Sequence, residues 1–312
     1  MPSFESAPGS ERAWNLLKKL GEGDAGEVYL VESILDKQIA ILKRPRRSAF
    51  TSDAIRQSSQ IEREANVLTA LAPLSQISNR LNVPRLLDKA RPGNEFSERY
   101  FIVITRASGF DLNFLARTVR FGAFETNALP AELYADLDGS QRDYLQRLAQ
   151  TNQIPTLILL RTLSSVIEFL GTIHKYEFST PATHHYGIIW NDIKPDHFFW
   201  DPIHSRITLI DWGNAHFLEA DGATTDRQHS HLDDYVQFMS EMGSFISSNA
   251  PDLHEKLAWP RELTLPNVVT EGIKPLQERI TTVMGETIAE LRRARQKEAD
   301  ITSSNSLDYS RF

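Results

Sequence analysis

The sequence predicts an α+β fold in two lobes: a five-stranded antiparallel sheet with one main helix, then a mostly helical lobe. Between Trp14 and Thr105, short β-branched and aromatic runs alternate with turn residues around one long amphipathic segment. From Phe110 onward, apolar residues recur at helical spacing instead. We expect a disordered segment at residues 1–12, lobes at 13–108 and 109–299, an insertion within the second lobe at about 118–153, and a polar tail at 300–312.

The composition is that of an ordinary globular protein, with 312 residues, 41% hydrophobic and 24% charged. The formal charge of −7 and the pI of about 5.8 give no reason to expect nucleic-acid binding. The sequence has no cysteine and opens without a signal-peptide pattern, so we expect a cytoplasmic protein. The longest apolar stretch, residues 154–173, is interrupted by polar residues and predicts a buried helix rather than a membrane span.

A glycine-rich turn lies near the N-terminus. Gly21, Gly23 and Gly26, followed by Val28, form the pattern G-x-G-x-x-G-x-V. In dinucleotide-binding folds such glycines open a helix, but here residues 27–31 are β-branched and aromatic and predict a strand. The segment is therefore either a phosphate-covering turn between two strands or a plain hairpin with a glycine tip.

A lysine and a glutamate in this lobe are candidates for an ion pair. Lys43 ends an apolar strand at residues 38–43. Residues 51–71 predict a helix, and Glu64 lies on the apolar stripe that contains Ile61 and Leu68. Because an unpaired buried charge is costly, Glu64 needs a cationic partner, and Lys43 is our candidate. The alternative is a solvated acid at the edge of the stripe.

Two acids lie in different settings between Trp190 and Gly213. Asp192 occupies a loop and is followed by Lys194, whereas Asp211 ends a predicted strand at residues 207–210. Phosphoryl transfer needs one acid to orient the attacking hydroxyl and another to hold a metal ion on the phosphates. A β-hairpin whose acids cap its turns is the structural alternative.

These motifs, in this order, resemble the protein kinase superfamily, as a divergent serine/threonine kinase with a shortened activation segment. Asp192 and Lys194 match the aspartate and lysine of the kinase catalytic loop, and Asp211 with the next two residues stands for the Asp-Phe-Gly motif. The resemblance implies ATP and Mg²⁺ or Mn²⁺ as cofactors and a protein substrate or regulatory protein as partner, without a nucleic-acid or membrane partner. It implies these roles: catalytic, Asp192 and Lys194; nucleotide-binding, Gly21, Gly23, Gly26, Val28, Lys43 and Glu64; metal-binding, Asp211 and His197.

The sequence departs from the kinase pattern at several positions. His197 replaces a metal-binding asparagine, and imidazole nitrogen suits Mn²⁺ better than Mg²⁺, which prefers oxygen. Trp190 and Asn191 replace the usual His-Arg pair, which implies that no phosphorylation of the activation segment is needed. After Gly213 no Ala-Pro-Glu motif follows, and we expect Asp233 to brace the catalytic loop from a helix.

Three functions remain open at this point. The first is an ATP-dependent protein kinase acting on serine or threonine hydroxyls, which Lys194 favours. The second is a pseudokinase that serves as a nucleotide-binding or scaffold module, which His197 favours. The third is a small-molecule phosphotransferase of the aminoglycoside or choline kinase type, which the run Ile210 to Trp212 and the short activation segment favour.

Overall fold

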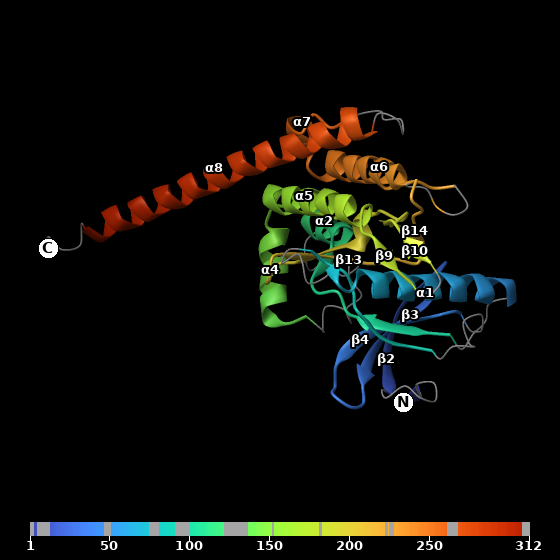
Figure 1. Ribbon diagram of the computed structural model, residues 1–312. Coiled ribbons are helices and arrows are strands. Elements are labelled where there is room, and N and C mark those ends of the chain that lie inside the picture. The colour runs from blue at the N-terminus through green and yellow to red at the C-terminus, as the bar shows by residue number, and fades with distance from the viewer. Residues whose placement is uncertain are drawn as a thin grey trace.

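The protein folds into a sheet-containing lobe and a helical lobe, with one helix lying between the sheet and the other helices (Figure 1). The computed structural model describes residues 3–4, 13–46, 51–74, 81–90, 100–121, 137–151, 153–180, 183–221, 224, 228–260 and 268–307. The α+β class expected from the sequence is confirmed.

The first lobe is built on a six-stranded sheet in the order β1-β2-β3-β4-β7-β6. Its strands pair antiparallel throughout. In chain order they span Ser3–Phe4 (β1), Trp14–Gly23 (β2), Gly26–Ser33 (β3), Ile39–Arg44 (β4), Leu86–Lys89 (β6) and Ile102–Thr105 (β7).

Five of these strands were predicted, and β1 was not. Ser3 pairs with Asn15, and Phe4 pairs with Trp14. The expectation of disorder over residues 1–12 is therefore wrong for these two positions, and the rest of that stretch lies outside the described residues. These two residues form a strand because β2 would otherwise be the edge of the sheet. An edge strand presents unpaired backbone groups, which can pair with an extended segment nearby.

Helix α1, Thr51–Leu71, has the bounds that the sequence predicts. Ile61, Leu68 and Leu71 are buried, and α1 packs on β4, β6 and β7. This apolar stripe fixes which face of the helix meets the sheet, and Glu64 lies on that face and is also buried.

The helices of the second lobe are α2 (Leu112–Phe121), α4 (Gly139–Ala149), α5 (Thr156–Ile173), α6 (His231–Asn249), α7 (Pro251–Lys256), a π-helical turn at Val268–Ile273, and α8 (Lys274–Leu307). A four-stranded sheet in the order β5-β13-β12-β8 lies beside them. Its strands are Leu81–Asn82 (β5), Phe110–Asp111 (β8), Phe198–Asp201 (β12) and Arg206–Leu209 (β13). Two short pairs join β9 (Phe178–Ser179) to β10 (His184–His185) and β11 (Ile188–Ile189) to β14 (His216–Phe217).

The core helix α5 covers most of the apolar stretch singled out in the sequence. By length and composition it would be able to cross a membrane. In this fold it is a packed core helix, because its apolar side chains, among them Leu159, Leu163, Val166 and Leu170, are fully buried. The expected insertion at 118–153 contributes the end of α2 and all of α4, which contact each other, while residues 122–136 lie outside the described part.

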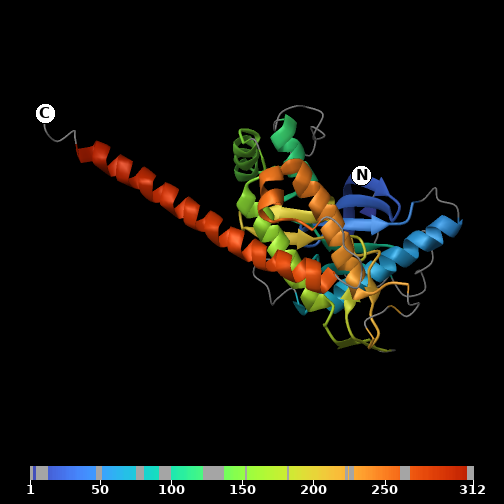
Figure 2. The ribbon, with the colours of Figure 1, turned by 90° about the horizontal axis from the view of Figure 1, so that it is seen from above.

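Helix α8 continues to Leu307, so residues 300–307 of the polar tail expected from the sequence are helical. Its first turns pack against α5, and the helix then extends away from the body of the protein (Figure 2). Within the described residues, every side chain from Leu291 to Glu298 is exposed. Helix-forming residues such as Glu, Arg, Ala, Gln and Lys dominate this part and favour its helical conformation.

Candidate active site

Strand β4 and helix α1 place Lys43 and Glu64 in contact. Lys43 stands opposite Val28 on β3 and opposite Ile102 on β7. Its Nζ lies 2.8 Å from both carboxylate oxygens of Glu64. The Glu64 side chain is 1% exposed and the Lys43 side chain 12%. The ion pair proposed from the apolar stripe is therefore present, and it satisfies a carboxylate that would otherwise be buried without a partner.

The same lysine also reaches the second lobe. Lys43 Nζ lies 3.1 Å from Oδ1 of Asp211, which is 168 positions later in the sequence. Burial lowers the pKa of Lys43, but the charges of Asp211 and Glu64 outweigh it and raise that pKa above its ordinary value. The Lys43 charge in turn lowers the pKa of Asp211. A permanent cation and a permanent anion therefore meet where the lobes join.

The loop acid Asp192 lies in the same region and is held at both oxygens. Lys194 Nζ lies 2.5 Å from Oδ1, and the side-chain amide of Asn214 donates to Oδ2 at 3.1 Å. Burial lowers the pKa of Lys194, but the hydrogen bond and charge of Asp192 outweigh it, so that the net shift is upward. The Asp192 side chain is only 11% exposed. Asn214, which follows the Asp-Trp-Gly motif, is a site residue that sequence reasoning missed.

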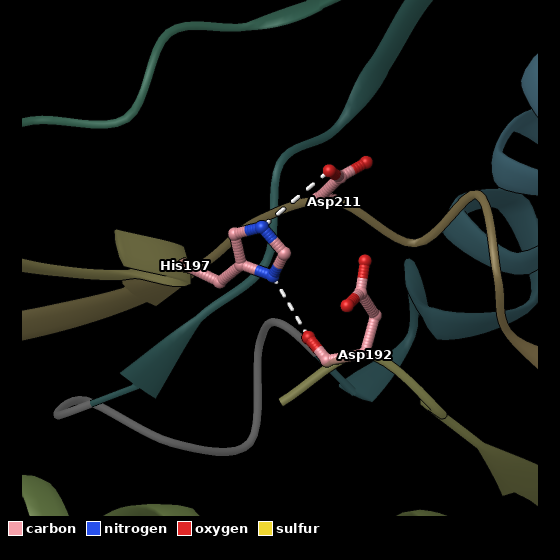
Figure 3. Close-up of side chains that lie close together, drawn as sticks. All are labelled: Asp192, His197 and Asp211. Atoms are coloured by element: carbon pink, nitrogen blue, oxygen red, sulfur yellow. Dashed lines mark hydrogen bonds and ion pairs between the residues drawn. The ribbon is translucent and has the colours of Figure 1, made fainter. Parts of the chain in front are cut away.

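His197 lies between the two acids (Figure 3). Its Nδ1 is 2.8 Å from the backbone carbonyl oxygen of Asp192, and its Nε2 is 3.5 Å from Oδ2 of Asp211. Because a carbonyl oxygen only accepts hydrogen bonds, Nδ1 carries the hydrogen. The remaining nitrogen, Nε2, faces the carboxylate of Asp211, and a cation between the two atoms would be bound by both.

The donor atoms present fit a divalent metal ion. Asp192, His197 and Asp211 each offer one ligand atom, and these atoms lie within 4.8 Å of one another. Two carboxylates and one imidazole form a mixed oxygen and nitrogen set, which suits Mn²⁺ and, less well, Mg²⁺. The residues assigned from the sequence to the metal, Asp211 and His197, are thus brought together.

Two tryptophans join the loops that carry the acids. The rings of Trp190 and Trp212 stack with centroids 4.9 Å apart, and both side chains are fully buried. The indole Nε1 of Trp190 also donates to the backbone carbonyl oxygen of Asp211 at 3.0 Å. Trp190, noted in the sequence only as a departure, therefore fixes the Asp211 backbone relative to the Asp192 loop. The sequence did contain one indication of this contact, because each tryptophan lies within two residues of one of the acids.

The backbone is strained at both loops. Asn191 has φ of 58° and Asp211 has φ of 65°, values in the left-handed region. Asn and Asp are the side chains that tolerate this region best, and such residues persist where the surroundings hold them. Here those surroundings include Gln237 of α6, whose amide donates to the Asn191 side chain at 3.0 Å and accepts from the Ile193 backbone at 3.1 Å.

Helix α6 braces the catalytic loop through Asp234, not through Asp233 as expected. Asp234 is fully buried and accepts hydrogen bonds from the backbone N–H groups of Trp190 and Asn191, at 2.9 and 2.7 Å. His174 Nε2 completes the set at 2.8 Å. Asp233 instead accepts from the backbone N–H of Ser230 in a capping box. Adjacent helix positions point about 100° apart, so only one of the two acids faces the loop.

The glycine turn joins β2 and β3, so the strand expected after the glycines is present. Gly26 has φ of 122°, and an added Cβ would lie 2.2 Å from the carbonyl oxygen of Arg44, so that only glycine fits there. At Gly21 and Gly23, by contrast, an added Cβ would meet no atom within 4 Å. Packing within the described residues therefore does not require glycine at these two exposed positions.

A cavity of about 380 Å³ lies apart from the acids. Its walls include two residues of α1, one residue of β10 and residues that follow the Asp-Trp-Gly motif; they are Arg63, Val67, His185, Ala215, His216, Phe217 and Thr224. None of the residues assigned to catalysis, nucleotide or metal lines it. The candidate active site is therefore the group of side chains around Lys43 and the two acids, and this cavity is separate from it.

Comparison with known protein families matches residues 17–217 to APH, the phosphotransferase enzyme family. The chain belongs to this family. The matched range of the phosphotransferase contains the glycine turn, Lys43, Glu64 and both acids, and it ends before α6. No curated protein matches the sequence significantly.

Among solved structures, the phosphotransferase is similar to the crystal structure of a double mutant of the Mycobacterium tuberculosis PknI kinase domain. The TM-score is 0.53 and the sequence identity is 17%, over 88% of this chain and 98% of that one. At this identity the similarity shows the fold alone. The family match together with this fold confirms the expected resemblance to the protein kinase superfamily.

Proposed function

We propose that this phosphotransferase transfers the γ-phosphate of ATP to a hydroxyl group, at the place where Lys43 of the first lobe meets the acids of the second. The observation that carries the proposal is the contact of Lys43 with Asp211 at 3.1 Å, with Glu64 holding the lysine from behind. Catalysis of phosphoryl transfer consists mainly of positioning and of charge stabilisation, and this arrangement supplies a fixed cation and a fixed anion.

Each residue of the candidate site then has a specific role in binding or transfer. Lys43 Nζ binds the α- and β-phosphates, and the backbone N–H groups at Gly21 and Gly23 cover the phosphates from β2. Asp211 and His197 would hold the metal ion, which supplies neutralisation of charge on the phosphate oxygens. A carboxylate oxygen of Asp192 orients the acceptor hydroxyl and takes its proton, and Lys194 neutralises charge on the γ-phosphate as it transfers.

We propose a serine or threonine hydroxyl of a protein as the acceptor. Lys194 supports this choice, because it lies 2.5 Å from Asp192 and thus beside the point where the acceptor hydroxyl must sit. The family resemblance implies such a lysine in protein kinases and not, in general, in small-molecule kinases.

A small hydroxylated molecule is the second candidate. Only a short segment links Gly213 to α6, which begins at His231. Between them the chain forms β14 and an isolated bridge from Leu218 to Thr224, and the sequence lacks an Ala-Pro-Glu motif. Such a segment offers little platform for a peptide, and the family match is to phosphotransferase enzymes in general.

The test is transfer from γ-labelled ATP with Mg²⁺ or Mn²⁺, to a protein mixture and to a metabolite mixture. Asp192→Ala should reduce the rate by about 10²–10⁴-fold, the usual contribution of a general base. Asp196→Ala is the matched control, since this exposed acid lies two residues from Lys194 and should leave the rate nearly unchanged. Nucleotide-induced stabilisation without transfer to either mixture would identify a pseudokinase and overturn the proposal.

A further inference from the structure

We infer that Asn214 is a positioning residue for Asp192, and that Gln60 of α1 sets the orientation of its amide. The inference rests on the proposed function, because it assigns a role to a neighbour of the proposed base. Two hydrogen bonds form the connection. Asn214 Nδ2 donates to Asp192 Oδ2 at 3.1 Å, and Gln60 Nε2 donates to Asn214 Oδ1 at 3.1 Å.

The chemistry of the three groups permits only one arrangement. An ionised carboxylate accepts hydrogen bonds and cannot donate, so Asn214 must present its NH₂ to Asp192. Its carbonyl oxygen then faces α1, where it needs a donor, and the NH₂ of Gln60 supplies it. If the Asn214 amide turned over, its oxygen would face a carboxylate oxygen, and the repulsion would displace Asp192.

The hydrogen bond from Gln60 to Asn214 leaves another atom of Gln60 without a partner. The other side-chain atom of Gln60, Oε1, is buried and has no hydrogen-bond partner among the described residues. Turning the Gln60 amide over would change which of its atoms faces Asn214 and would place two carbonyl oxygens together. Buried unsatisfied oxygens are uncommon in folded proteins, and one that is kept calls for a reason. Donation toward Asn214, and through it toward Asp192, is that reason.

Helix α1 therefore contacts both halves of the proposed machinery. Gln60 and Glu64 are four residues apart and so lie on one face of the helix. Glu64 holds Lys43, the phosphate-binding cation, while Gln60 acts through Asn214 on the proposed base. A shift of α1 away from the second lobe would release both at once, so that phosphate binding and orientation of the acceptor depend on one helix position.

Gln60→Glu tests the connection with nearly unchanged shape. A carboxylate at position 60 accepts from the Asn214 NH₂ and turns the amide, so its oxygen faces Asp192. We expect kcat to fall by about 10- to 100-fold, the size of effect seen when a group is misplaced by about 1 Å. KM for ATP should change by less than about two-fold, since the phosphate-binding residues are untouched. Asn66→Asp makes the same chemical change at an exposed position of α1 and should leave kcat unchanged.

A double-mutant cycle shows whether Gln60 acts through Asn214. In the Asn214→Ala background, Gln60→Glu should have no further effect on kcat, because no amide remains to be turned. Independent, multiplying effects would overturn the inference. Thermal unfolding of each variant separates lost activity from lost folding, and Gln60→Glu remains informative if Asn214→Ala does not fold.

A measurement without turnover keeps this inference separate from the proposed function. With ¹⁵N-labelled asparagine, the side-chain NH₂ signal of Asn214 is assigned by its loss in Asn214→Ala. The signal should move in Asp192→Ala and in Gln60→Glu, and stay in place in Asn66→Asp. An inactive wild type with these shifts would overturn the proposed function and keep the connection. An active wild type whose Asn214 signal ignores both changes would overturn the connection alone.

Discussion

The Nδ1 atom of His197 donates a hydrogen bond of 2.8 Å to the backbone carbonyl oxygen of Asp192. This bond gives the ring two roles at once. It fixes the loop that carries the proposed base, and it leaves Nε2 facing Asp211 at 3.5 Å as the potential metal ligand. We therefore infer that the departure from asparagine seen in the sequence exchanges one ligand for another, because Nε2 of the imidazole lies close to a carboxylate oxygen of Asp211.

The first prediction concerns metal preference. His197→Asn replaces a nitrogen ligand by an amide oxygen, which Mn²⁺ favours less and Mg²⁺ favours more. The Kd for Mn²⁺ should rise by about 10-fold, at the low end of the losses caused by changes around metal sites. Mg²⁺ should bind as well as before or more tightly. Electron paramagnetic resonance of free Mn²⁺, with Mg²⁺ as competitor, measures both constants without turnover.

His204→Asn is the matched control for this experiment. His204 is 61% exposed and pairs with Asp201 at the turn between β12 and β13, the strands that lie between His197 and Asp211 in the sequence. It should leave both metal constants unchanged. A Mn²⁺ constant that is equal in wild type and in His197→Asn would show that the imidazole is not a ligand.

The second prediction concerns the buried pair Lys43 and Glu64. Lys43→Met leaves Glu64 buried without its cation, which should cost about 3–5 kcal/mol of unfolding free energy at neutral pH. The double variant Lys43→Met with Glu64→Leu removes both charges and should recover most of that loss. Urea unfolding of the three proteins measures the difference. A double variant no more stable than Lys43→Met would contradict the pairing.

The cost of Lys43→Met should also depend on pH. Burial raises the pKa of Glu64, and removal of the lysine removes the main charge that opposes this rise. A carboxyl group whose pKa is higher in the folded state than its ordinary value of about 4.3 contributes stability below that value. The contribution is lost as the pH rises through the folded-state pKa. Lys43→Met should therefore approach the wild-type stability near pH 5 and fall furthest behind it at pH 8.

The sequence located the residues whose order and spacing are set by the backbone. Glu64 followed from the apolar helical stripe of α1, which is buried in the structure. Lys43 followed from its place at the end of an apolar strand, and it lies on the less buried face of β4 with Ile39 and Ile41. The two acids followed from a strand end and a loop.

Contacts between distant segments could not be predicted in this way. Which of Asp233 and Asp234 faces the catalytic loop depends on the rotation of α6 against that loop, and adjacent acids give no local signal for it. The connection from Gln60 to Asn214 depends on how α1 meets the loop after Asp211. Neither relationship leaves a periodic pattern, because the partners are distant in the sequence: Gln60 and Asn214 are 154 positions apart, and Asp234 is 44 positions from Trp190.

The third prediction separates the two acids of α6. Asp234→Asn replaces an acceptor of two backbone hydrogen bonds by an amide that can accept from only one side. Hydrogen bonds to a charged group contribute about 1.5–3 kcal/mol each, so the loss of one should be visible in the unfolding free energy. The loop of Asp192 should also lose order, and transfer activity should fall. Amide hydrogen exchange at Trp190 and Asn191 reports this directly.

Asp233→Asn is its neighbouring control. That residue serves the capping box of α6, and a weakened cap costs about 0.5–2 kcal/mol. Exchange at Trp190 and Asn191 should stay slow in this variant, since Asp234 still accepts from both. Equal exchange in the two variants would mean that α6 braces the loop by packing alone.

The fourth prediction concerns two leucines of α8 in opposite settings. Leu276, near the start of the helix, is fully buried, whereas Leu291 is 45% exposed and lies in a run of exposed residues that reaches Glu298. Leu276→Ala should cost about 2.7–5 kcal/mol through lost burial and a cavity. Leu291→Ala should change stability by no more than about 0.5 kcal/mol, as for other surface substitutions. Because the substitution is the same and only the burial of the leucine differs, thermal unfolding of the two variants measures the contribution of packing directly. A large loss of stability in Leu291→Ala would show that this part of α8 is covered in solution.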